Sequence, residues 1–304
     1  MTLTYLPVHF FLRFAQPVTA DTPPLFVLRS VLGKNLRAIG CIAPQNTCPD
    51  CMYNRTCAYA FLFETVLPAE NSAMPGRDRA SHPFVFTGGD VSTGKTFSSF
   101  DFTITLAGQA VEYLPYIHAA FVRAGQEGLF KERTPFKVTK VSAGAEDLLQ
   151  QPGLQTASGQ AKNWHLDEKL AERTGEILVE LKSPLRFKYG GAYGIDFSAQ
   201  DFFRCLYRRA RTLCLLYGSA DNLPVYTPGD AFQIAERRLV WQDYCHYSAR
   251  QKKSMNLGGV LGSFKLRGSF TAMEQNLLEF SRICNAGKNT NFGFGQLDYW
   301  VKWE

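Results

Sequence analysis

The sequence predicts an α+β fold with two tandem ferredoxin-like domains, each with the element order strand, helix, strand, strand, helix, strand. Two observations predict it. This order of alternating and helical apolar patterns occurs twice along the chain, and 304 residues with 45% hydrophobic content can fill two cores at ~150 residues each. We therefore expect a first domain at residues 1–142, a linker at 143–175 and a second domain at 176–304.

The first domain begins with a strand at 8–14, where apolar residues alternate and place one face in the core. His9, Phe11 and Arg13 share the opposite face, which would make a surface suited to base stacking. The remaining elements follow from helical or alternating apolar spacing: a helix at 25–36, strands at 82–87 and 100–106, a helix at about 109–123 and a strand at about 129–141.

The second domain repeats this order. Its expected elements are a strand at about 176–188, a helix at 198–217, strands around 236–249 and 257–270, a helix at 271–284 and a closing strand at 292–302. RNA-recognition motifs use the same arrangement of strands and helices, so the fold is compatible with an RNA ligand.

Positive charge is concentrated in the second half. Residues 1–180 carry 16 Lys and Arg against 17 Asp and Glu, whereas residues 181–304 carry 17 against 10. Phosphate contacts release counterions, so the second half is the favoured nucleic-acid surface, although a solvated basic face without a ligand would have the same composition. No run of ~18 apolar residues and no signal-peptide pattern occur, so we expect a soluble cytoplasmic protein without a membrane partner.

Four of the eight cysteines fall within seventeen positions, at Cys41, Cys48, Cys51 and Cys57. A reducing compartment disfavours disulfides and leaves a tetrahedral zinc site as one physical alternative. Buried free thiols and redox-labile pairs are the others. Four thiolates leave no open position for a substrate, so a zinc ion here would be structural and not catalytic.

The most specific pattern lies towards the C-terminal end. Residues 258–264 are glycine-rich, a helix follows, and residues 285–295 read NAGKNTNFGFG. Glycines let backbone N–H groups approach phosphates closely, and Lys288 adds a positive charge. This stretch resembles the glycine-rich signature of the CRISPR precursor-RNA-processing endoribonucleases, the Cas six family of the RAMP superfamily. The resemblance continues in 181–188 and 241–251, and more loosely in 28–33 and 57–64.

The resemblance implies two RNA-recognition-like domains, a repeat-RNA substrate, a role in CRISPR antiviral defence, and cleavage without a metal cofactor that leaves a 2′,3′-cyclic phosphate and a 5′-hydroxyl. Such a reaction needs a base for the substrate's 2′-hydroxyl and an acid for the leaving 5′-oxygen. Histidine suits both roles. Our first choice is His246, in the basic half, and our second is His118. The alternatives are structural or RNA-contacting roles for these histidines and a mechanism in which Lys or Arg is active.

For RNA binding we expect contacts from Arg204, Arg208 and Arg211, which share one helix face; a solvated outer surface of a core helix is the alternative. The other predicted RNA-binding residues are Arg237, Arg238, Arg250, Lys252, Lys253, Lys265, Gly287, Lys288, Gly293 and Gly295. Repeat RNA and other CRISPR effector subunits are the expected partners. The competing hypotheses are a non-catalytic RAMP subunit that holds guide RNA in a surveillance complex, and a generic RNA-binding module stabilised by zinc.

Overall fold

The computed structural model describes residues 1–65, 67, 73–74, 79–89, 93–150, 153–219, 225–248 and 253–304, with the backbone alone at 245–248 and 253–255. The chain forms two compact units. We call residues 3–163 with 215–218 the N-terminal unit, and residues 1–2, 164–214 and 219–304 the C-terminal unit.

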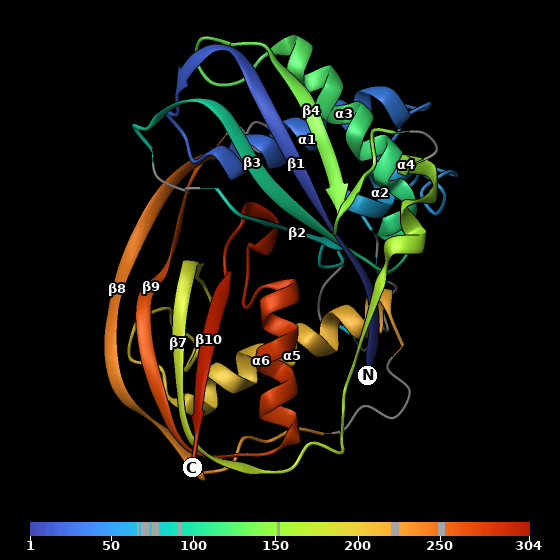
Figure 1. The fold of residues 1–304 in the computed structure, drawn as a ribbon. Coiled ribbons are helices and arrows are strands. Elements are labelled where there is room, and N and C mark those ends of the chain that lie inside the picture. The colour runs from blue at the N-terminus through green and yellow to red at the C-terminus, as the bar shows by residue number, and fades with distance from the viewer. Residues whose placement is uncertain are drawn as a thin grey trace. The chain divides into compact units, whose positions relative to one another are not determined.

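The chain from residue 2 to residue 165 carries the first set of elements (Figure 1). In order these are β1 (Thr2–Thr19), α1 (Pro24–Gly40), α2 (Ala58–Phe63), β2 (Phe84–Thr87), β3 (Thr96–Ala107), a 3-10 helix (Gly108–Tyr113), α3 (Leu114–Glu127), β4 (Phe136–Ala143), β5 (Glu146–Asp147), α4 (Gly153–Thr156), a second 3-10 helix (Ala157–Gln160) and β6 (Lys162–His165). The sheet order is β2-β3-β1-β4-β5, and β6 pairs with β1.

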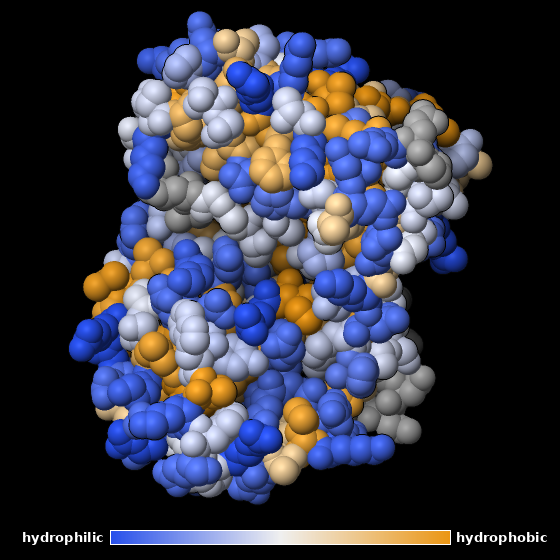
Figure 2. Space-filling model, in the orientation of Figure 1, coloured by the Kyte–Doolittle hydropathy of each residue, from blue (hydrophilic) through white to orange (hydrophobic). Residues whose placement is uncertain are grey.

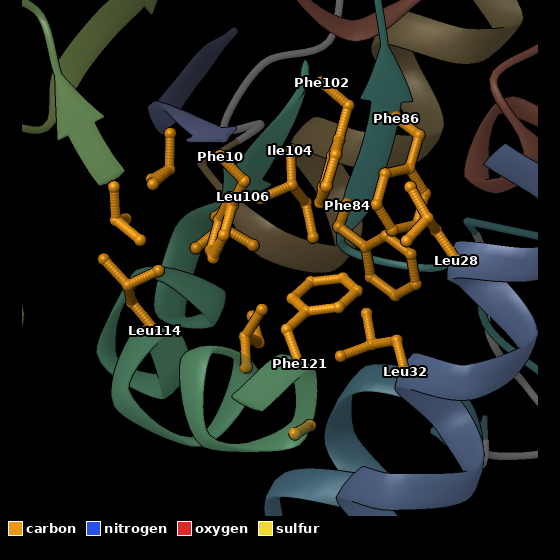
Figure 3. Close-up of a cluster of buried hydrophobic side chains, with 14 of the residues drawn as sticks. Phe10, Leu28, Leu32, Phe84, Phe86, Phe102, Ile104, Leu106, Leu114 and Phe121 are labelled. Carbon is orange, nitrogen blue, oxygen red and sulfur yellow. The ribbon is translucent and has the colours of Figure 1, made fainter. Parts of the chain in front are cut away.

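The core of the N-terminal unit lies between this sheet and helices α1 and α3. Alternation along β1 turns Phe10 inward, where its ring stacks on Phe102 of β3 at 5.3 Å between centroids and contacts Phe121 of α3. Figure 3 shows side chains of the strands and of both helices pointing towards one another in this cluster. The opposite face of the sheet is left to polar and half-buried side chains.

The C-terminal unit repeats the arrangement with β7 (Arg173–Leu185), α5 (Ala199–Tyr217), β8 (Phe232–Ser248), β9 (Lys253–Phe270), α6 (Ala272–Cys284) and β10 (Leu297–Trp303). The sheet order is β10-β7-β9-β8, so the first strand again lies between the third and the fourth. Both sheets have the strand order and connections of a ferredoxin-like fold. The predicted α+β fold with two tandem ferredoxin-like domains is therefore confirmed.

Two predicted strands begin later than expected. Gly128, at φ +78°, ends α3, and a tight turn follows in which Leu129 and Thr134 exchange backbone hydrogen bonds, so β4 starts at Phe136 and not at 129. Near the C-terminus a 3-10 helix occupies Thr290–Phe292, and β10 starts at Leu297. Residues 143–175, expected to be a linker, contain β5, α4, a 3-10 helix and β6.

None of the helices among the described residues combines the length and the hydropathy that a membrane crossing requires.

Candidate RNA-binding site

The glycine-rich segment after α6, residues 285–295, forms a closed loop that we call the glycine loop. Asn285 Nδ2 donates to the carbonyl oxygen of Phe294 at 2.9 Å, and the N–H of Ala286 donates to the carbonyl oxygen of Gly295 at 2.8 Å. The loop is fixed to the end of β7, because the N–H of Lys288 donates to the carbonyl oxygen of Arg186 at 2.8 Å. The backbone of the loop is therefore held in place before any ligand binds.

The glycines of this loop are required by its own packing. A Cβ atom at Gly295, where φ is +75°, would lie 1.8 Å from the carbonyl oxygen of Ala286, and one at Gly287 would lie 2.5 Å from that of Arg186. Their N–H groups donate within the protein, from Gly287 to the Cys205 thiol and from Gly295 to the carbonyl oxygen of Pro184. Both glycines thus shape the loop.

A buried cation, Arg209 of α5, supports the loop from the core side. Its guanidinium donates to Thr290 Oγ1 at 2.8 Å. It also donates, at 3.4 Å, to the carbonyl oxygen of Cys284, which is the last residue of α6. A charge in this position is compatible with burial because it is hydrogen-bonded. Arg209 therefore joins α5 to both ends of the turn that presents Lys288.

Three cations surround one aromatic ring beside the glycine loop, and we call Arg186, Lys188, Lys288, Tyr193 and Trp241 the Tyr193 cluster. The Arg186 guanidinium lies 3.9 Å from the centroid of the Tyr193 ring, and the Lys188 and Lys288 ammonium groups lie 5.3 and 5.9 Å from it. Trp241 of β8 completes the cluster, with its ring centroid 6.3 Å from that of Tyr193. Cations at these distances interact favourably with an aromatic face.

The Tyr193 cluster is held at its base by β9. Arg186 Nη1 donates to the carbonyl oxygen of Gly258 at 2.5 Å, and a Cβ atom at Gly258 would lie 2.5 Å from the Trp241 ring. Among the described residues the three cations form no ion pair with a carboxylate. Asp243, which lies on β8 like Trp241, accepts a hydrogen bond from Trp241 Nε1 at 3.0 Å. The cluster can therefore offer positive charge to phosphates and ring surfaces to bases.

Several residues that the sequence predicted to bind RNA are engaged within the protein. Arg204 pairs with Asp201 at 3.2 Å, Lys265 pairs with Glu236 at 2.8 Å, and Arg237 donates to the carbonyl oxygen of Phe197 at 2.8 Å. Arg208 and Arg238 are exposed, and Arg211 is half-buried. Gly293, at φ +87°, donates its N–H to the carbonyl oxygen of Thr290.

Other predicted contacts fall in or next to residues 249–252, between the end of β8 and the start of β9 in the sequence. Arg250 and Lys252 lie outside the described residues, and Lys253 is described by its backbone, which pairs with Ser248. Of the predicted set, the structure brings Gly287 and Lys288 together with the Tyr193 cluster, and their role in RNA binding stays a prediction.

The two predicted catalytic histidines belong to different units. His246 lies on β8, where its backbone is opposite Met255, and its side chain is outside the description. His118 lies on α3 of the N-terminal unit and is half-buried; burial lowers the pKa of its imidazole, because the charged form loses hydration. Neither assignment is tested by these positions.

The four clustered cysteines are partly buried free thiols in the connection between α1 and α2. Cys41, Cys51 and Cys57 line one small cavity together with Tyr53. Burial raises the pKa of Cys48, and the charge of Glu64 acts in the same direction. Among the described residues no group of three or more Cys, His, Asp or Glu side chains is arranged to hold a metal ion, so zinc stays a prediction.

Four members of the Tyr193 cluster were missed by the search for binding residues: Arg186, Lys188, Tyr193 and Trp241. A signal for the first two is present, because buried Leu185 and Phe187 alternate with them and turn their side chains outward. Tyr193 follows the turn at Gly190 and Gly191, and no local pattern places it over Arg186. Its position depends on tertiary contacts.

Comparisons with known proteins agree with this fold. The family model for the CRISPR-associated endoribonuclease Cas6 matches residues 179–297, and a family model described as an N-terminal domain matches residues 3–162. No curated protein matches the sequence.

Solved structures resemble the whole chain at low identity. A product complex of a Cas6 from Thermus thermophilus shares 14% identity, with 97% of this chain and 100% of that chain covered and a TM-score of 0.51. A structure titled partial Cas6-RT-Cas1–Cas2 complex shares 13% identity, with 99% of this chain and 46% of that chain covered and a TM-score of 0.56. At these identities the likeness concerns the fold.

Proposed function

We propose, from the match of residues 179–297 to the model of the CRISPR-associated endoribonuclease Cas6 family, that this member of the family binds CRISPR repeat RNA and cleaves precursor transcripts. The observation that supports this proposal most is the Tyr193 cluster, in which three cations with no carboxylate partner among the described residues surround a half-buried ring next to the glycine loop. Phosphate contacts and base stacking are the two interactions that such a group offers to RNA.

The proposed reaction uses the substrate's own 2′-hydroxyl and no metal ion. A base removes the 2′-hydroxyl proton, the 2′-oxygen attacks the adjacent phosphorus, the bond from phosphorus to the 5′-oxygen breaks, and an acid protonates that oxygen. The products are a 2′,3′-cyclic phosphate and a 5′-hydroxyl. Cations beside the phosphate stabilise the charge that develops on its oxygens, and Lys288 and Arg186 are our candidates for that role.

His246 is our first candidate for the base or the acid. It lies on β8, the strand that also carries Trp241 of the Tyr193 cluster. His118 is the second candidate. Its lowered pKa favours the neutral imidazole at pH 7, which suits a base, whereas its half-buried position on α3 suits a structural role.

The proposal is tested by incubating the protein with its cognate repeat RNA in excess EDTA, beside the same RNA with a 2′-deoxy nucleotide at the scissile position. We expect cleavage of the first substrate into a cyclic-phosphate product and no cleavage of the second. Binding of both RNAs without cleavage of either would contradict the proposal and support a guide-holding RAMP subunit instead.

We also propose a structural zinc ion at Cys41, Cys48, Cys51 and Cys57, and other CRISPR proteins as partners. The spacing of these cysteines in the sequence supports the first proposal, although the thiols of the described residues are not arranged to hold a metal ion. Metal analysis of the purified protein tests it: about one equivalent of zinc is expected, and a content below about half an equivalent would exclude a four-thiolate site.

A further inference from the structure

The sheet of the N-terminal unit has an outer face that the proposed reaction does not use. Alternation along β1 places His9, Phe11 and Arg13 on this face, opposite the buried Phe10 and Leu12. Strand β3 adds Asp101 and Thr103 through its pairing with β1, and β4 adds its outward residues on the other side. Over the strands of this unit Figure 2 shows hydrophilic and hydrophobic side chains interspersed.

A β-bulge in β4 changes which cations reach this face. Phe11 pairs with Lys140, but Leu12 pairs with Val138 and Arg13 with Lys137, so Thr139 is an extra residue on β4. In a regular strand, residues three positions apart point to opposite faces. Because of the bulge, Lys137 and Lys140 both point to the face that carries Phe11 and Arg13.

The cations of this face have no carboxylate partner among the described residues. Arg13, Lys137 and Lys140 are exposed and form no ion pair, and the Lys140 ammonium lies 5.7 Å from the centroid of the Phe11 ring. Asp101 of β3, which faces Phe11, lies 3.4 Å from His9 Nε2, while His9 Nδ1 is 3.0 Å from Thr103 Oγ1.

The aromatic rings of this face are positioned for stacking. The His9 ring contacts the Phe11 ring at 4.4 Å between centroids in an edge-on arrangement, and both side chains are only partly covered. A base that stacked on Phe11 would replace Lys140 over the ring, and the released ammonium could then contact the phosphate of the same nucleotide. A sheet face with a partly exposed Phe11 ring suits an unpaired base and not a duplex.

We propose that this face, formed by His9, Phe11, Arg13, Lys137 and Lys140, is a second RNA-binding site, and that it takes an unpaired, single-stranded stretch of RNA. The identity of the bound RNA rests on the proposed function, because the single-stranded stretch would belong to the same precursor transcript. Phe11 stacks a base, and the three cations contact the phosphates on either side of it.

The test is the affinity of the full-length protein for a labelled oligouridine, which forms no hairpin, measured by fluorescence anisotropy over a range of salt. Phe11→Leu keeps an apolar side chain and removes the ring, so we expect the affinity to fall at least about fivefold. Lys137→Gln with Lys140→Gln should reduce the salt slope by about 1.4, from ~0.7 for each phosphate contact on a single strand.

Two further variants separate this proposal from a general effect of charge or folding. Lys302→Gln removes a cation from exposed β10 in the other sheet and should leave the affinity for oligouridine within about twofold of the wild type. Asp101→Asn removes a negative charge from this face and should raise the affinity, a direction that loss of folding would not produce.

The proposal is overturned if both Phe11→Leu and the double Lys variant bind oligouridine within twofold of the wild type. If Phe11→Leu does not fold, as judged by circular dichroism, the exposed Lys137 and Lys140 still decide the matter. Wild-type protein that binds oligouridine through Phe11 but cleaves no repeat RNA would keep this proposal and refute the proposed function, so the two failures are distinguishable.

Discussion

Cations on the outer faces of the two sheets differ in whether they pair with carboxylates. On the C-terminal sheet Lys182 pairs with Glu180 at 2.7 Å, Lys265 pairs with Glu236 at 2.8 Å, and Arg267 pairs with Glu176. On the N-terminal sheet Arg13, Lys137 and Lys140 have no such partner among the described residues. The net charge of each half of the sequence therefore does not show which cations are available to bind a polyanion.

Within the C-terminal unit the available cations gather away from the sheet face, in the Tyr193 cluster. Lys188 and Lys288 are exposed there and share one ring with Arg186. The C-terminal unit therefore contains both paired and unpaired cations, and variants of each kind test which of them bind RNA.

The largest effect is expected for the catalytic assignment. His246→Ala should lower the rate of repeat-RNA cleavage by about 10²–10⁴-fold, the usual contribution of a general base or acid, whereas His118→Ala should change it less than tenfold. Single-turnover cleavage of saturating RNA measures both. The opposite ranking would assign the chemistry to α3 of the N-terminal unit.

The next effect concerns the glycine loop that presents Lys288. Gly295→Ala should destabilise the protein by about 3 kcal/mol or more, because the new Cβ atom meets the Ala286 carbonyl oxygen in addition to the strain of a positive φ. Gly190→Ala is the matched control: its φ is +54° and no atom lies within 4 Å, so about 1–2 kcal/mol is expected. Urea unfolding compares them, and equal losses would show that the loop tolerates the clash.

A smaller effect is expected from the pH dependence of stability. Burial lowers the pKa of His118 in the folded state, so the unfolded chain binds the proton more tightly. Stability is therefore lost as the pH falls below the ordinary histidine pKa of about 6.5 and down through the folded pKa. His118→Gln should show a weaker fall in urea midpoint between pH 7 and pH 5 than the wild type. An unchanged fall would mean that other groups cause it.

The sequence predicted the fold well because alternation and helical spacing are local signals that agree with tertiary burial. The strand at 8–14 and the helix at 25–36 lie within β1 and α1, and their inward residues are those of the core. The turn at 129–134 was missed, because positive φ at Phe130 and Arg133 is not expected of these residue types.

The candidate site was only partly predictable. Lys288 and the glycine loop have a recognisable sequence, whereas the contact of Arg186 with Tyr193 depends on where a turn and a strand end meet in space. The bulge at Thr139 has no marker in the sequence, and it decides which face Lys137 and Lys140 occupy. Ion pairs such as that of Lys265 with Glu236 depend on the register of β8 and β9, which cannot be predicted from amino-acid composition.

The most direct test of the account is the salt dependence of repeat-RNA affinity for three proteins: the wild type, Lys188→Gln with Lys288→Gln, and Lys265→Gln with Arg267→Gln. The account predicts that the first double variant lowers the slope of log affinity against log salt by about 1.4 to 1.8, at ~0.7–0.9 for each lost phosphate contact, and that the second leaves it unchanged. An equal reduction in both double variants, or none in the first, would contradict the claim that unpaired cations, and not net charge, bind the RNA.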